Sequence, residues 1–214
     1  CAACHAPRNL LGATHEANAL RGGVIPMQHW YAPSLADTQE AGIRADDIAQ
    51  TVQLLKTGMA AGRSAMGPMA EVVVRSTQHL GDADLQAMAV YLTSLAAASP
   101  PAPVLRPTDR PTPSAAGEKI YTRHCAQCHG EQGEGSPGAY APLAGNRAVT
   151  MGHSANLVQA VLSGGFPPAT ADNPRPYGMP PFRQTLDDGE VAEVLTYIRQ
   201  AWGNAAPAVS VLEV

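Results

Sequence analysis

Two pentapeptides in the chain share one pattern: two cysteines separated by two residues and followed at once by a histidine. They are Cys1-Ala2-Ala3-Cys4-His5 and Cys125-Ala126-Gln127-Cys128-His129. This pattern is typical of c-type haem attachment, because two thiols at that spacing add to the vinyl groups of one porphyrin. The histidine then lies where a neutral imidazole can ligate the iron. The sequence therefore predicts two covalently bound haem c groups, with His5 and His129 as iron ligands.

A CxxC pair can also form a redox-active disulfide or half of a zinc site. A thioredoxin-like protein would show a βαβ pattern around the motif, and the sequence has none. A zinc site would bring two CxxC pairs together in one small fold, whereas these two lie far apart and each is followed by histidine. The two motifs use all four cysteines, which leaves no thiol for another disulfide or for a nucleophile.

A methionine after each motif is predicted to be the second axial ligand. Met179 lies between a glycine and two prolines in a stiff loop, fifty residues after His129. A thioether opposite histidine raises the haem potential and leaves no open position for a substrate. In the first half Met59, Met66 and Met69 share a glycine-rich loop, and we predict Met69 as the ligand with Met66 as the alternative. The five remaining histidines are alternative sixth ligands: His15, His29, His79, His124 and His153.

The far nitrogen of a ligating imidazole usually donates to a backbone carbonyl. Pro33 and Pro142 each follow an alanine in a loop after a haem motif. We expect these two prolines to supply that carbonyl or to pack on the imidazole. The aromatic residues of the last helix in each half are expected to pack against haem or against Tyr121: Tyr91, Tyr197 and Trp202.

The bulk composition excludes some classes of function. The chain has 214 residues and a formal charge of −4, with no basic stripe, so nucleic acid is not an expected partner. It has no run of about 18 apolar residues, the length that a membrane-spanning helix needs. The 19 prolines and 20 glycines indicate a loop-rich fold. Because a haem motif stands at residue 1, we expect the sequence to be a piece of a longer secreted precursor.

The sequence divides into two haem-binding units. Residues 1–99 form the first, without an N-terminal helix, and residues 114–204 form the second. Residues 100–113 are a proline-rich, extended linker, and residues 205–214 are a tail with no clear structure.

Capping residues predict where the helices begin and end. Asp46 or Asp47 caps a helix that stops at Gly58, and Asp82 opens the last helix of the first unit. In the second unit, Ser114 and Ser154 each cap a helix. Asp187 opens a further helix and forms a capping box with Glu190. Alternating strand patterns are absent, so the fold class is predicted to be all-α.

Three longer sequence segments resemble those of class I cytochrome c domains. They are Trp30-Tyr31-Ala32-Pro33-Ser34-Leu35, Gly67-Pro68-Met69-Ala70-Glu71 and Pro174-Arg175-Pro176-Tyr177-Gly178-Met179-Pro180-Pro181-Phe182. More narrowly, the chain resembles the multihaem cytochrome subunits of membrane-bound periplasmic dehydrogenases. The resemblance implies two tandem class I cytochrome c domains joined by the linker. It also implies electron transfer without catalysis, and a location in the periplasm at the outer face of the inner membrane.

Such subunits commonly carry three haem domains, of which this chain resembles the second and third. The resemblance implies a catalytic dehydrogenase subunit as partner, often a pyrroloquinoline-quinone alcohol dehydrogenase or a molybdenum aldehyde or heterocycle dehydrogenase. Electrons would pass on to a quinone or a terminal oxidase, and membrane association would be through these partners. One alternative is a free dihaem shuttle between a respiratory complex and an oxidase. Another is a haem enzyme of the peroxidase type, which would need an open sixth position.

Overall fold

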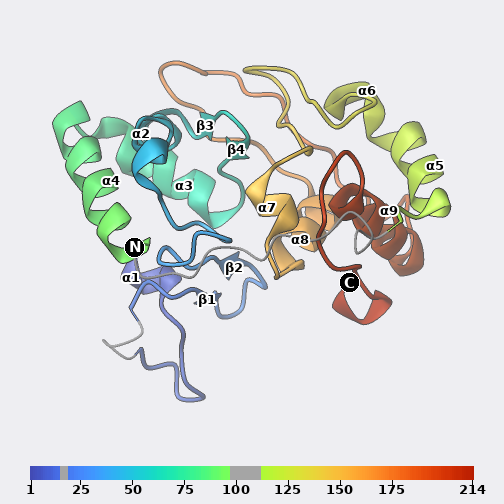
Figure 1. The fold of residues 1–214 in the computed structure, drawn as a ribbon, viewed down its shortest axis with the longest axis horizontal. Coiled ribbons are helices and arrows are strands. Elements are labelled where there is room, and N and C mark those ends of the chain that lie inside the picture. The colour runs from blue at the N-terminus through green and yellow to red at the C-terminus, as the bar shows by residue number, and fades with distance from the viewer. Residues whose placement is uncertain (15–18, 97–111) are drawn as a thin grey trace.

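The computed structural model describes residues 1–14, 19–96 and 112–214. The fold is mostly helical, as the sequence predicts, and it has an N-terminal half and a C-terminal half that lie side by side (Figure 1). Strands are present, contrary to expectation, as two short antiparallel ribbons. β1 (Gly23–Val24) pairs with β2 (Tyr31–Ala32), and β3 (Met59–Ala60) pairs with β4 (Arg63–Ser64). Two residues per strand are too few to produce a readable alternation in sequence.

The N-terminal half is built on the packing of α2 against α4. Its helical elements are α1 (Ala2–His5), η2 (Ala45–Asp47), α2 (Ile48–Thr57), α3 (Pro68–Arg75), η3 (Thr77–His79) and α4 (Asp82–Ala96). The predicted stop at Gly58 is confirmed, since Gly58 adopts the left-handed conformation with φ of 77°. Leu85 and Ala89 on α4 are fully buried. The two predicted helices therefore exist, and α4 packs on α2 with Leu85 and Ala89 in the core.

One stretch of this half differs from expectation. The residues around Met69 were predicted to be a loop, but Pro68 begins α3 and Met69 lies in its first turn. Proline suits this position because the first amide of a helix needs no partner and the ring fixes φ near the helical value. Met69 is therefore held on a helix and not on a free loop.

The C-terminal half is built on a crossing of α5 and α9. Its elements are α5 (Ala115–His124), α6 (Ala126–His129), α7 (Arg147–Thr150), α8 (Ala155–Ser163), α9 (Asp188–Gln200) and η5 (Val211–Glu213). Two predicted caps are confirmed: the Ser114 hydroxyl accepts from the Gly117 amide, and Asp187 and Glu190 form a capping box. On α9, the residues Val191, Val194, Leu195 and Ile198 are all buried.

Gly117 lies at the point where α5 meets α9. A Cβ at this position would be 2.2 Å from the carbonyl oxygen of Glu193 and 2.7 Å from Cβ of Tyr197. Only glycine lets the two helix backbones approach this closely. The crossing in turn fixes where α5 ends and therefore where the second haem motif begins.

The last ten residues are not the structureless tail that the sequence predicted. Val209 is buried, and its amide donates to Oγ1 of Thr196. Arg199 on α9 is almost completely buried and donates to the carbonyl oxygens of Pro207 and Val149. A buried guanidinium must find acceptors, and this segment supplies one of them. Residues 97–111, which include most of the predicted linker, lie outside the described part of the chain.

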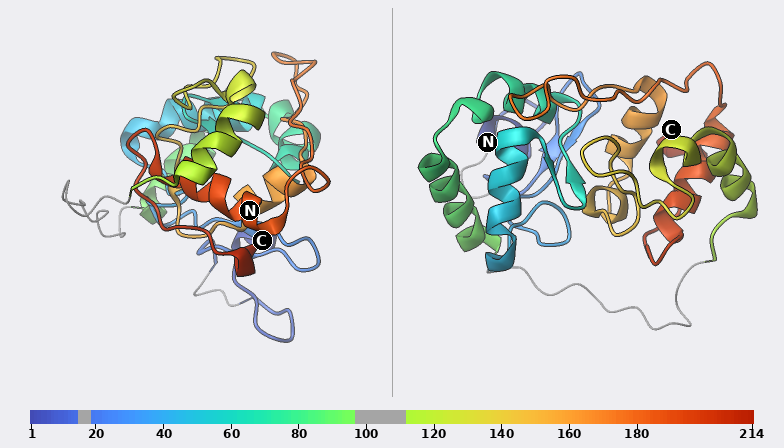
Figure 2. Two further views of the ribbon diagram at one scale, coloured as in Figure 1. Left: turned by 90° about the vertical axis from the view of Figure 1, so that its right-hand side faces the viewer. Right: turned by 90° about the horizontal axis from the view of Figure 1, so that it is seen from above.

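The two halves pack directly against each other. The Asn156 side chain receives a hydrogen bond from the Tyr31 amide and donates one to the Tyr31 carbonyl, both at 2.8 Å. The ring of His153 stacks on the Tyr31 ring at 4.0 Å. Figure 2 shows a long segment of the C-terminal half, coloured orange, running over the N-terminal half. The halves therefore form one packed body.

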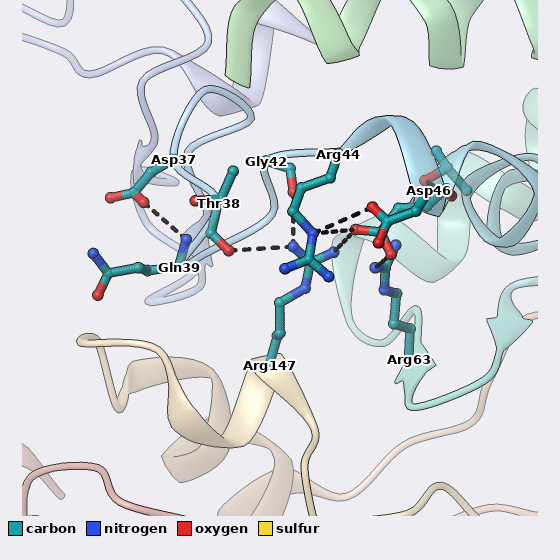
Figure 3. A network of polar contacts seen from close by, with 10 residues as sticks. Asp37, Thr38, Gln39, Gly42, Arg44, Asp46, Arg63 and Arg147 are labelled. Carbon is teal, nitrogen blue, oxygen red and sulfur yellow. Dashed lines mark hydrogen bonds and ion pairs between the residues drawn. The ribbon is translucent and has the colours of Figure 1, made fainter. Parts of the chain in front are cut away.

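A buried ion cluster is part of this interface (Figure 3). Arg147 on α7 donates to the carbonyl oxygen of Gly42 at 2.7 Å and lies 3.5 Å from Oδ2 of Asp47. Asp47 is buried, and its other oxygen lies 2.7 Å from Nη2 of Arg63. Burial raises the pKa of the Asp47 carboxyl, but Arg63 and then Arg147 outweigh burial, so the net pKa is lowered. The Asp47 side chain therefore holds these arginines and does not cap α2.

Asp47→Asn is expected to lower the free energy of unfolding at pH 7 by about 2 kcal/mol, because charge-assisted hydrogen bonds to two arginines are lost. A carboxyl whose pKa is depressed by folding stabilises above its ordinary pKa of 3.8, and this contribution is lost as the pH falls through the lower folded value. Wild-type stability should therefore decline below about pH 4, and the decline should be shallower in the variant. Denaturant unfolding at several pH values measures both effects.

The matched control is Asp46→Asn, because the neighbouring Asp46 side chain is 73% exposed. It should change stability by less than about 0.5 kcal/mol. Equal effects of the two variants would show that the buried cluster does not hold the halves together.

Candidate haem sites

The second haem motif follows directly from α5. Cys125 ends that helix, and α6 turns once so that the His129 amide donates to the Cys125 carbonyl at 3.0 Å. Nδ1 of His129 lies 2.9 Å from the carbonyl oxygen of Ala141. Because a carbonyl only accepts, Nδ1 carries the proton and Nε2 keeps its lone pair. Burial lowers the pKa of His129, against the opposing effect of this hydrogen bond, so the imidazole is neutral.

The carbonyl partner of His129 belongs to Ala141 and not to Pro142. The Pro142 carbonyl instead accepts from Nδ2 of Asn146 at 2.8 Å. Gly135, with φ of 65°, packs against the Ala141–Pro142 peptide, where a Cβ would be 2.6–2.7 Å from backbone atoms. This close approach holds the loop so that the carbonyl of Ala141 faces His129, and not the carbonyl of Pro142, which the sequence suggested. Pro142 still follows the carbonyl that holds the ring.

A cavity beside the motif brings the predicted ligands of the second site together. It is lined by Cys125, Cys128 and His129, and also by Met179. Met179 is held by two backbone hydrogen bonds with Gly165, at 2.8 and 3.0 Å. Much of the remaining wall is apolar, from residues such as Ala139, Pro167, Pro180 and Phe182. Two thiols, a neutral imidazole and a thioether around an apolar cavity are the donor set that a c-type haem needs.

The Cys125 thiol does not resemble a redox-active cysteine. Burial, followed by the neighbouring Cys128, raises the pKa of the Cys125 thiol to about 11. Reactive CxxC cysteines instead have a lowered pKa, because the thiolate is the nucleophile. Across residues 1–14, 19–96 and 112–214, no group of three or more His, Cys, Asp or Glu side chains is arranged to hold a metal ion. The arrangement therefore favours haem over the disulfide and zinc interpretations.

An aromatic cluster fixes the second motif against α9. The Tyr121 ring lies 5.5 Å from that of Tyr197 and 4.8 Å from that of Trp202. The Tyr121 hydroxyl donates to the carbonyl of Gly130, immediately after the motif, at 2.6 Å. Tyr197 and Trp202 therefore pack against Tyr121, as the sequence predicts. Tyr91 does not join such a cluster, since it is 59% exposed on α4.

The first motif has the same local arrangement. α1 turns once so that the His5 amide donates to the Cys1 carbonyl at 2.9 Å. Nδ1 of His5 lies 2.7 Å from the carbonyl oxygen of Pro33, one of the two prolines that the sequence marked for this role. Burial lowers the pKa of His5, so this imidazole is also neutral with Nε2 free.

The three methionines of the N-terminal half have different surroundings. Met59 and Met66 line the cavity of the second site, together with Ser64. Met69, on α3, is not among the residues around that cavity. Met69 as the ligand of the first haem, with Met66 as the alternative, stays a prediction. The positions of Met59 and Met66 at the second site could not be predicted, because no local sequence pattern indicates a contact between the halves.

The remaining histidines have other contacts. Nε2 of His79 lies 3.1 Å from the Val74 carbonyl, and His153 stacks on Tyr31. His124 lines the second cavity and meets the Phe182 ring edge-on. His29 has a positive φ of 57° in the turn between β1 and β2. His15 lies outside the described residues.

Comparison with known proteins gives matches over nearly the whole chain. A family model described as Cytochrome c matches residues 114–202. The chain is 36% identical over 223 residues to "Alcohol dehydrogenase (quinone), cytochrome c subunit" of Gluconobacter oxydans, covering 97% of this chain and 46% of that protein. It is 31% identical over 235 residues to "Fructose dehydrogenase cytochrome subunit" of Gluconobacter japonicus, covering 98% and 48%.

A shorter relative matches 42% of the chain. "Cytochrome c-552" of Thermus thermophilus is 37% identical over 92 residues, which are 70% of that protein. By contrast, the chain spans about half the length of the two dehydrogenase subunits that it matches. Within the described residues, every helix is too short or too polar to cross a membrane.

Proposed function

Since this chain belongs to the cytochrome c family, we propose that it is an electron-transfer subunit of a dehydrogenase complex and binds two haem c groups. One observation carries the proposal. At the second site, a CxxCH histidine bonded to a backbone carbonyl shares an apolar cavity with Met179. His129 and Met179 would both bind the haem iron and would leave it no binding position for a substrate. The chain itself would therefore carry electrons and make no bonds in the substrate.

The two haem groups would be held by two tandem cytochrome c domains, residues 1–99 and 114–204, joined by the linker 100–113. Two features support this division. Each half has a one-turn helix in its CxxCH motif and a histidine bonded to a backbone carbonyl. Each half also has its own cluster of buried apolar residues.

The protein's contribution is to position the side chains that would bind haem. Cys1 and Cys4, and equally Cys125 and Cys128, would form the thioether links. His5 with Met69, and His129 with Met179, would be the axial pairs. Bound haem iron would supply the one-electron redox chemistry. The carbonyl bonds to both imidazoles and the Gly165 pairing with Met179 keep the donor atoms in place, so that little has to move when an electron arrives.

The electrons would come from a catalytic dehydrogenase subunit and leave to a quinone or a terminal oxidase. Support comes from the relatives, which are named as the cytochrome subunits of a quinone alcohol dehydrogenase and a fructose dehydrogenase. The complex would lie in the periplasm at the outer face of the inner membrane. This chain would reach the membrane through its partners.

Purification of the natural protein from detergent-extracted membranes tests this proposal. A catalytic dehydrogenase is expected to co-purify in fixed ratio, and the substrate of that enzyme should reduce the haem groups within the complex. Adding the same substrate to the separated cytochrome subunit is the control and should reduce nothing. A dihaem protein that migrates alone, with no dehydrogenase at any detergent concentration, would contradict the proposal and favour a free electron shuttle.

A further inference from the structure

The cavity of the second haem site has a wall that comes from the other half of the molecule. Met59, Ser64 and Met66 of the N-terminal half line it together with Cys125 and His129. Met59 and Ser64 are paired residues of the β3–β4 ribbon. The open end of that ribbon therefore lies at the second site. In the sequence, the ribbon precedes the Cys125–His129 motif by more than sixty positions.

The segment that carries Met179 also rests on the N-terminal half. Oγ1 of Thr170 lies 3.5 Å from the Thr57 carbonyl, and Nδ2 of Asn173 lies 3.7 Å from Sδ of Met59. This segment, residues 165–179, is part of the orange trace that runs over the N-terminal half in Figure 2. These polar contacts are long, so they do not by themselves hold the segment.

This segment approaches the N-terminal half closely at Gly58. A Cβ there would be 1.8 Å from Cγ of Pro168 and 2.6 Å from its Cδ. Gly58 is the residue that ends α2, immediately before Met59. The absence of a side chain at this one position allows Pro168 to lie against the N-terminal half.

We propose that the N-terminal half completes the second haem site, both by supplying its Met59 and Met66 wall and by holding the segment that presents Met179. The inference rests on the proposed binding of haem at Cys125–His129. An apolar wall excludes water and disfavours the oxidised iron, which carries one more positive charge, so it raises the potential. The redox properties of the second haem therefore depend on the packing between the halves.

The first test compares Gly58→Ala with Gly62→Ala. Both glycines flank or belong to the β3–β4 ribbon and have similar positive φ angles, 77° and 66°, so the backbone strain of alanine is matched. A Cβ on Gly62 would meet nothing within 4 Å, whereas one on Gly58 must displace Pro168. Only Gly58→Ala should lower the midpoint potential of the second haem, by a roughly tenfold shift in the ferric–ferrous equilibrium, or about 59 mV. It should also allow cyanide to bind at that iron.

A second pair of variants changes the wall without disturbing the contact at Gly58. Met66→Gln makes the wall polar. It should lower the midpoint potential of the second haem, as a severalfold shift of its ferric–ferrous equilibrium toward the ferric form, with little change in the thermal unfolding temperature. Met27→Gln is the control, since Met27 is 94% exposed on a loop of the same half. Spectroelectrochemistry of the dihaem protein measures all four variants, with the first haem as an internal reference.

The outcomes separate this inference from the proposed function. If Gly58→Ala and Met66→Gln both leave the second potential equal to that of their controls, the inference is wrong and the function stands. If peptide mapping finds no haem on Cys125 and Cys128, both are wrong. If Gly58→Ala does not fold, Met66→Gln alone decides.

Discussion

Met179→Ala is expected to lower the midpoint potential of the second haem by on the order of 100 mV, a fraction of the ~0.8 V range over which axial ligands set haem potentials. The thioether stabilises the reduced iron, and alanine leaves the position to water. Met179 is fixed by its backbone pairing with Gly165, so truncation of the side chain should leave the loop in place. The variant should also bind cyanide or carbon monoxide at one iron per chain, as measured by difference spectroscopy.

The matched control is Met151→Ala. Met151 is buried in the same half and does not line the cavity, so its loss should reduce stability without moving either potential. If Met179→Ala leaves both potentials unchanged and binds no external ligand, another side chain holds the iron. His124 and Met66, which line the same cavity, would then be the residues to test.

Gly117→Val is expected to lower the free energy of unfolding by about 3 kcal/mol, the upper part of the usual range for overpacking. The new side chain would collide with the Glu193 backbone and the Tyr197 side chain, and the α5–α9 crossing cannot separate without disturbing the Tyr121 cluster. Guanidinium-induced unfolding of the holoprotein measures the loss. Because α5 leads into Cys125, the fraction of chains with haem at the second motif should also fall.

Gly152→Val is the control for this change. A Cβ at Gly152 would have open space around it, so the substitution should change stability by no more than about 0.5 kcal/mol. A similar small effect of Gly117→Val would mean that the two helices do not need their close approach.

Local signals explain which elements the sequence predicted. The capping box of Asp187 and Glu190, the Ser114 cap and the Gly58 stop act within a few residues of each helix end, so they are readable from sequence. α3 was missed because its N-terminal Gly67-Pro68-Met69 stretch resembles a loop. Proline at the first helical position is equally consistent with a helix start, and that is its role here.

Long-range contacts explain what the sequence did not predict. The Asn156 pairing with Tyr31 joins residues 125 positions apart, and Arg199 reaches the carbonyl of Val149 across 50 positions. No short pattern reports such contacts, so the burial of Val209 in the C-terminal segment was not foreseen. The placement of Met59 and Met66 at the second site was missed for the same reason.

The haem motifs are the most local feature of all, since five consecutive residues define each one. Their carbonyl partners depend on loop register, which sequence reports less well. In both loops, a proline was predicted to supply the histidine's carbonyl partner or to pack on the imidazole. His129 bonds instead to the carbonyl of Ala141, because Gly135 packs tightly on the Ala141–Pro142 peptide. Residue types and spacing therefore predict the chemistry of a site more reliably than its exact backbone partners.

The most direct test is the intact mass of the purified natural protein, followed by mass mapping of its proteolytic peptides. Two haem groups should be added to every chain, one on the peptide with Cys1 and Cys4 and one on the peptide with Cys125 and Cys128. A single haem would remove one of the two redox centres. No haem, or a disulfide within either motif, would contradict the electron-transfer account altogether.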